Sequence, residues 1–121
     1  MVQNSQLRNF AVSAAFAAAA TVALKTTDAS TDYIYVTGIV LTITTHANGK
    51  NVTFEDNAGT PVAFAQYNDL TVAAGANQGQ PIVYDFGTRG FKLTQGKQLQ
   101  VVSDSAGPAG AVVAYGYQSA S

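Results

Sequence analysis

The sequence contains no cysteine and only one histidine among its 121 residues. Without cysteine the chain has no disulfide framework, no thiol nucleophile, no iron–sulfur cluster and no thiolate zinc site. The single histidine, His46, cannot supply a metal site built from two or three imidazoles. It lies beside an expected turn, where we expect its ring to be solvated as an ordinary polar surface group.

Charge is also scarce, because Asp, Glu, Lys and Arg together make up 11% of the residues. Six basic residues oppose seven acidic ones, which gives a net charge of −1 with no run of either sign. The chain therefore lacks the basic surface by which proteins bind nucleic acid or an anionic membrane, and we expect neither partner. Its hydrophobic content of 47% is ordinary for one globular domain.

The carboxylates show no arrangement typical of catalysis. Glu55 and Asp56 are adjacent, so on a strand their side chains point to opposite faces. His46 has no Gly-x-Ser-x-Gly nucleophile elbow to serve. Asp28 and Asp32 flank a Ser/Thr-rich turn and are candidate calcium ligands, although their spacing resembles no known calcium loop. We expect no enzyme activity, no catalytic residue, no cofactor and no metal site, with loop carboxylates left open as ion ligands.

An alanine-rich segment at residues 11–24 precedes the rest of the chain. It is too short and too rich in alanine for a membrane-spanning helix, which needs about 20 strongly apolar residues. A secretory signal peptide is a rival interpretation, but Arg8 is the only positive charge ahead of the segment. We expect an N-terminal arm at residues 1–18, followed by a β-sandwich domain at residues 19–121. Such an arm packs on a neighbouring subunit or on its own domain.

The remainder of the sequence predicts short strands, since β-branched and aromatic residues alternate with polar ones between turn signals every 8–12 residues. This spacing favours an all-β fold, a single antiparallel β-sandwich of the jelly-roll type with about eight strands. A glycine-rich loop at residues 73–81 interrupts the pattern. The predicted strands lie near residues 19–25, 33–45, 52–54, 62–67, 82–86, 91–93, 99–101 and 111–117, with a further short piece at 70–73.

Two local features add detail. In the strand at 33–45 the apolar residues change parity at Gly38, which predicts a β-bulge there. Asn48 and Gly49 follow this strand, and Asn-Gly is the preferred pair of a type I′ turn, so we expect a tight β-hairpin.

The six tyrosines admit two interpretations. Aromatic rings stack on sugars and on bases, but base stacking lacks the basic residues that bind the phosphates, whereas sugar binding stays open. Alternatively, the rings lie at strand ends and between subunits, with the hydroxyl groups in water. These residues are Tyr33, Tyr35, Tyr67, Tyr84, Tyr115 and Tyr117.

The second half of the chain has a recurring pattern of aromatic strand ends and glycine turns. It reads FGTRGFKLTQGKQLQV at residues 86–101 and AVVAYGY at residues 111–117. The pattern resembles the closing half of small jelly-roll proteins of tailed bacteriophages, notably the capsid decoration (cement) proteins. The matching positions are Phe86, Gly90, Phe91, Leu93, Gly96, Leu99, Val101, Val112, Val113, Tyr115 and Tyr117.

This resemblance implies a non-enzymatic structural protein on the capsid exterior of a virion. Such a protein forms a homo-oligomer, most often a trimer, that binds the major capsid protein and clamps neighbouring coat subunits. The arm then contacts those subunits, with Phe10 and Phe16 as apolar anchors and Arg8 as the only charge. The alternative is a carbohydrate- or receptor-binding jelly roll of a phage tail or a secreted protein, which would gather exposed tyrosines at one end.

Overall fold

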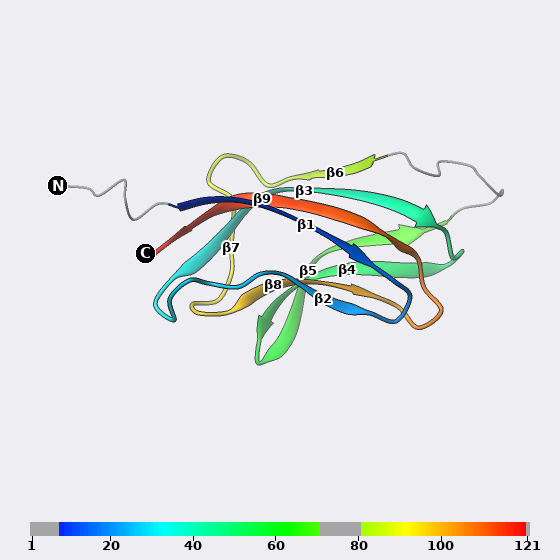
Figure 1. Ribbon diagram of the computed structural model, residues 1–121, viewed down its shortest axis with the longest axis horizontal. Coiled ribbons are helices and arrows are strands. Elements are labelled where there is room, and N and C mark those ends of the chain that lie inside the picture. The colour runs from blue at the N-terminus through cyan, green and yellow to red at the C-terminus, as the bar shows by residue number, and fades with distance from the viewer. Residues whose placement is uncertain (1–7, 71–80, 121) are drawn as a thin grey trace.

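The computed structural model describes residues 8–70 and 81–120, and every regular element in these two ranges is a β-strand. Nine strands form two antiparallel sheets that pack face to face (Figure 1). Sheet A has the order β1-β9-β3-β6, with β7 also paired to β3, and sheet B has the order β2-β8-β4-β5. The strands are β1 (Arg8–Phe16), β2 (Thr21–Lys25), β3 (Tyr33–Thr45), β4 (Lys50–Ala58), β5 (Thr60–Asp69), β6 (Pro81–Asp85), β7 (Phe91–Lys92), β8 (Gln98–Ser103) and β9 (Ala109–Ser119).

The strand order is that of a jelly roll. When the two-residue β7 is left out and the others are renumbered, the sheets read 1-8-3-6 and 2-7-4-5, in which each sheet takes strands from both halves of the chain. The predicted all-β jelly-roll sandwich is therefore confirmed. Within the described ranges no helix is long and apolar enough to cross a membrane.

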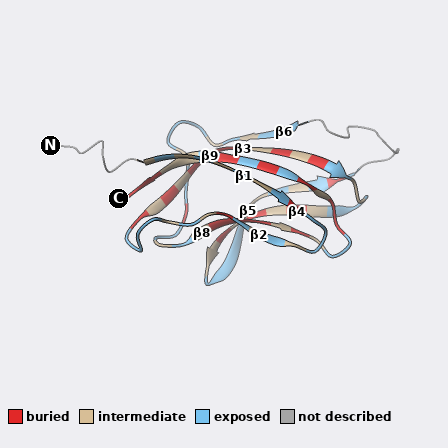
Figure 2. Cartoon of the chain, in the orientation of Figure 1, coloured by how far each residue is buried: buried red, intermediate tan, exposed pale blue. Residues whose placement is uncertain are grey.

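The core lies between the sheets and follows the alternation of the strands, visible as buried bands along β9 and β3 in Figure 2. Along β3, Ile34 and Val36 are buried. After Gly38 the buried residues have the opposite parity and are Ile39, Leu41 and Ile43. The register between β3 and β9 shifts between Val36 and Gly38, so the predicted bulge is confirmed. The fully buried side chains include Ile34, Val36, Ile39, Leu41, Val52, Phe54, Leu99, Val101 and Val112.

The N-terminal arm expected at residues 1–18 is corrected over its described part. Residues 8–16 form β1, which pairs with β9 along its whole length, from Arg8 opposite Gln118 to Phe16 opposite Gly110. Alternate residues of β1 face the core, and the small alanines between them suit a strand that is half buried. The low β-propensity of alanine concealed this strand in the sequence, because packing against β9 outweighs propensity. Residues 1–7, residues 71–73 of the expected short piece and residues 73–80 of the glycine-rich loop lie outside the described residues.

The hairpin expected at Asn48-Gly49 is also corrected. Strands β3 and β4 do not pair with each other, because they belong to different sheets, and the turn between them crosses from sheet A to sheet B. The Lys50 amide donates to the Ala47 oxygen at 3.1 Å, and of the two central residues only Gly49 has a positive φ. A type I′ turn needs a positive φ at both.

Candidate binding face

The outer side of sheet A, called here the A face, presents four in-register rows of side chains. Because the alternate residues of β1, β9, β3 and β6 pack into the core, the residues between them point to solvent. Only two of the positions in these rows are charged, and both lie toward one end. The rows are Ala15-Ala111-Thr42-Pro81, Ser13-Val113-Val40-Val83, Ala11-Tyr115-Gly38-Asp85 and Asn9-Tyr117-Tyr35-Lys92.

One half of the A face is uncharged and mostly apolar. Val113 and Val83 are 41% and 61% exposed, and Val40 lies between them in register. Ala111 and Ala15 extend this surface along the next row. We call Ala15, Val40, Val83, Ala111 and Val113 the valine patch. It is a surface of β-branched and small residues at which another protein can approach the sheet closely.

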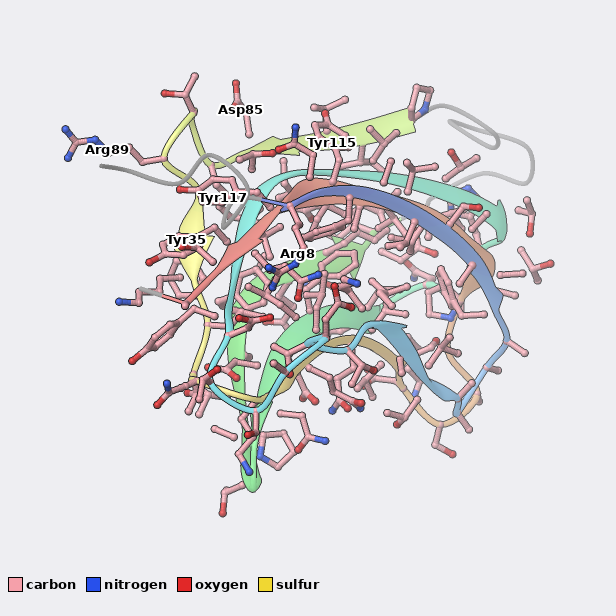
Figure 3. The ribbon with its side chains drawn as sticks, turned by 60° about the vertical axis from the view of Figure 1, so that its left-hand side comes forward. Arg8, Tyr35, Asp85, Arg89, Tyr115 and Tyr117 are labelled. Atoms are coloured by element: carbon pink, nitrogen blue, oxygen red, sulfur yellow. The ribbon has the colours of Figure 1, made fainter. Side chains whose placement is uncertain are left out.

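The other half of the A face is aromatic. The Tyr115 side chain, 38% exposed, lies across the neighbouring strand over Gly38 (Figure 3). A Cβ at Gly38 would approach Cε2 and Cζ of that ring to 2.6 Å, so the absence of a side chain at Gly38 makes room for the ring. Thr37 Oγ1 donates to the Tyr115 carbonyl oxygen at 3.0 Å. The Tyr115 ring therefore has a defined position on the sheet, over Gly38.

Tyr117 is fixed in a different way. Its ring stacks on Tyr35 with a centroid separation of 4.7 Å and an interplanar angle of 9°. Its hydroxyl donates to the Arg89 carbonyl oxygen at 2.8 Å, which joins β9 to the loop after β6. The Lys92 ammonium lies 4.1 Å from the Tyr33 ring centroid, a cation–π contact at the end of the row.

An open pocket of about 550 Å³ lies between these tyrosines and the 87–88 turn. We call it the tyrosine pocket. Asp85 is the only charged side chain among the described residues that line it, and one of its carboxylate oxygens accepts a hydrogen bond from the Gly87 amide at 2.8 Å. The side chains that line the pocket include Asn9, Thr37, Val83, Asp85, Tyr115 and Tyr117.

The three residues expected to contact a partner all have contacts inside the chain. The Arg8 guanidinium is paired with Asp32 through NH2 and with Asp28 through Nε, the latter at 3.3 Å. Phe16 is buried in the core and Phe10 packs against the core. A role of these residues toward another protein stays a prediction.

The Arg8 contacts also bear on the calcium ligands considered above. Asp32 is 3% exposed, and the cationic group that contacts both Asp32 and Asp28 is the guanidinium of Arg8. Within residues 8–70 and 81–120, no group of three or more His, Asp and Glu side chains is arranged to hold a metal ion.

The expectation of a solvated His46 is wrong. Its side chain is 10% exposed, and Nδ1 lies 3.0 Å from a carboxylate oxygen of the buried Asp69. The same carboxylate accepts the Ala47 amide at 2.8 Å. These contacts fasten the connection between β3 and β4 to the end of β5, so His46 has a structural role. No local sequence pattern indicates this contact, because His46 and Asp69 are far apart in the chain.

Two tyrosines near this cluster have altered acidity. Burial raises the pKa of Tyr67, and the negative charge of Asp69 beside it raises it further. Burial also raises the pKa of Tyr84, followed by the charge of Tyr67. Both hydroxyls are therefore held in the protonated form at neutral pH, which suits a structural role and not a nucleophilic one.

The sequence analysis missed the A face. The signal was present in the parity of the last strand, where Ala111, Val113, Tyr115 and Tyr117 share one side. It was hidden because the inward residues of the same strand are also apolar, so β9 shows little contrast between its two sides.

A comparison with protein-family models gives no match, and neither does one with curated proteins. One similar solved structure comes from work titled "Bacillus endospore appendages form a novel family of disulfide-linked pili". It has a TM-score of 0.49 and 12% sequence identity, over 93% of this chain and 85% of that chain. A likeness of this size assigns neither a family nor a function to this chain.

Proposed function

We propose that this chain is a non-enzymatic structural protein that attaches to other protein subunits through the valine patch of its A face. The main support is the geometry of that patch, in which the exposed Val113 and Val83 flank the half-buried Val40 in register, without a charge between them. Contiguous exposed apolar surface marks interaction sites on soluble proteins.

The chemistry of the patch specifies its partner. A charged partner side chain placed against Val113 and Val83 would lose its hydration without gaining a hydrogen bond. The partner surface is therefore another uncharged protein surface. This fits a repeated contact between coat subunits better than it fits an ionic contact.

The size of the A face favours attachment by several copies at once. Four strands about 4.8 Å apart and about seven residues of about 3.4 Å each give a face of roughly 450 Å². A standard interface buries about 800 Å² on each partner, so one A face alone attaches weakly. Several copies held together bind a lattice far more tightly than one copy does. A homo-oligomer, and specifically a homotrimer, meets this need.

The more specific form of the proposal is a capsid decoration protein on the exterior of a virion, with the major capsid protein as its partner. The jelly-roll strand order and the sequence resemblance support it. The resembling segments 86–101 and 111–117 supply β7 and most of β8 and β9, and β9 contributes Val113 to the valine patch.

The test is a pair of substitutions on opposite faces of the sandwich. Val113→Glu places a charge in the valine patch, whereas Val102→Glu places the same charge on the outer side of β8 in sheet B. Particles purified from the host that produces the chain are assayed for bound protein, and circular dichroism checks that both variants fold. We expect Val113→Glu to lower occupancy at least tenfold and Val102→Glu to leave it within twofold. Normal occupancy of a folded Val113→Glu variant would contradict the proposal.

A further inference from the structure

We propose that the tyrosine pocket binds a neutral pyranose saccharide, with one sugar ring stacked on Tyr115 and its hydroxyl groups bound by Asp85 and Asn9. The pocket lies beside the valine patch on the A face and shares only Val83 with it. The proposed structural function does not require this activity, and the two have separate tests.

The aromatic platform is already in place. Because the Tyr115 ring rests over Gly38, its position is set by the sheet and its outer side is left for a ligand. Tyr117 is held by its stacking on Tyr35 and by its hydrogen bond to the loop. A pyranose ring presents a face of C–H bonds that packs against an aromatic ring. Rings fixed beforehand lose little conformational entropy when they bind.

The wall of the pocket is also fixed. The loop after β6 is tied at one point by the Gly87 amide, which donates to Asp85, and at another by the Tyr117 hydroxyl, which donates to the Arg89 oxygen. The Gly90 amide donates to the Gly87 oxygen at 3.1 Å and closes the turn. This wall makes the aromatic half of the A face concave, and concavity suits a small ligand more than a flat protein surface.

The polar groups suit hydroxyls. An ionised carboxylate has about four acceptor positions, so Asp85 accepts from ligand hydroxyls in addition to Gly87. The Asn9 amide both donates and accepts, and the Thr37 hydroxyl oxygen accepts while it donates to Tyr115. These side chains lie around the aromatic rings, as recognition of a ring with hydroxyls at its edge requires.

The same groups exclude other ligand classes. The carboxylate of Asp85 repels sialic acids, uronic acids, sulfated sugars and phosphates, with no cationic side chain among the described residues that line the pocket to offset it. Beneath Tyr115 and Tyr117 an extended peptide finds no free strand edge, because β9 is paired with β1 on one side and β3 on the other, and the edges of the sheet lie at β1 and β6. A neutral, hydroxyl-rich ligand remains.

The first experiment applies the wild-type chain to a glycan array that contains neutral hexose oligosaccharides together with sialylated and sulfated ones. We expect retention on neutral glycans only. Saturation-transfer NMR with methyl β-glucoside, methyl β-galactoside and methyl α-mannoside then follows, and the C–H protons of one ring face should receive the strongest saturation from the protein. Retention confined to acidic glycans, or no retention at all, would overturn the proposal.

The second experiment measures affinity for the best retained neutral glycan in three variants. Tyr115→Ala should weaken binding at least tenfold, because it removes the platform, and Asp85→Asn should weaken it about fivefold. Val113→Glu is the matched control on the same face and should bind within twofold of wild type. Asp85→Asn changes an exposed side chain and tests the site even if Tyr115→Ala disturbs the fold. Equal binding by the wild type and a folded Tyr115→Ala or Asp85→Asn variant would refute the site. Loss of particle attachment with intact glycan binding in Val113→Glu would support both proposals as separate activities.

Discussion

The two outer faces of the sandwich share one architecture and differ in chemistry. On the A face many exposed residues are alanine, valine or tyrosine, with Val83, Val113 and Tyr115 the large apolar ones. On the outer face of sheet B the pointing-out residues are mostly amides and hydroxyls, and Gln100 Nε2 donates to Glu55 Oε1 at 2.7 Å. The B-face residues include Thr21, Asn51, Thr53, Glu55, Asn57, Gln66, Asn68, Gln98, Gln100 and Val102.

The average composition of the chain therefore hides a difference in residue type between its two outer faces. Charge is scarce on both faces, but hydrogen-bonding side chains cover most of the B face and only part of the A face. Much of the A face is apolar instead. A chain that contacted nothing would gain from polar residues on both sides, so the contrast supports our proposal that the A face meets other molecules.

The largest loss of stability is expected from Gly116→Ala, which disturbs the pairing of β9 with β3 beneath the A face. A Cβ at Gly116 would overlap the backbone oxygen of Tyr35, so β9 and β3 have to move apart. We expect a loss of about 3 kcal/mol in the free energy of unfolding, measured in urea.

The control for this prediction is Gly59→Ala in the turn between β4 and β5 of sheet B. No atom lies within 4 Å of a Cβ at Gly59, and only its φ of 97° opposes a side chain. We expect a loss of about 1 kcal/mol there. Equal losses at Gly116 and Gly59 would show that the close approach of β9 and β3 is unimportant for stability.

A smaller effect is expected from Arg8→Ala, which loosens the β1 edge of the A face. The substitution leaves Asp32 buried without its cationic partner, and we expect about 2 kcal/mol of destabilisation in urea. Lys25→Ala is the matched control, since Lys25 contacts the more exposed Asp28 at 3.4 Å and should cost less than about 0.5 kcal/mol. Unchanged stability of Arg8→Ala together with weaker particle attachment would instead favour the predicted partner contact of Arg8.

The smallest effect is a loss of stability at alkaline pH, which arises from Tyr67 and Tyr84 and not from the residues of either outer face. The pKa values of Tyr67 and Tyr84 are raised on folding from the usual 10.0, so the folded chain holds these protons more tightly than the unfolded chain does. Their contribution to stability is complete below about pH 10 and is lost as the pH rises through the folded pKa values. Urea midpoints at increasing pH should fall above about pH 10, and less steeply in Tyr67→Phe. A fall of the same steepness in Tyr67→Phe would contradict this origin.

Local patterns made much of the fold predictable. The parity change at Gly38 marked the bulge, and the alternation along the later strands gave the sandwich. The β1 strand was not predictable from its residues, since alanine fits an arm as well as a half-buried strand. Asn48-Gly49 marked a turn correctly but not its partners, because the choice between a hairpin and a crossing between sheets depends on contacts far away in the chain.

The binding face was harder to predict than the fold. Its rows join residues from five strands that lie up to more than a hundred positions apart in the chain, and only the register brings Val83, Val40 and Val113 together. The tyrosine pocket likewise depends on the ring of Tyr115 lying over Gly38 of another strand. The spacing of residues along the sequence indicates neither the register of the three valines nor the contact between Tyr115 and Gly38.

Electron cryomicroscopy of the native assembly would show which outer face of the sandwich contacts other subunits. We expect the valine patch of each copy to lie against a neighbouring protein subunit and the outer face of sheet B to lie toward solvent. A structure in which the B face is buried against the subunits, with Val113 and Val83 exposed to water, would contradict this expectation.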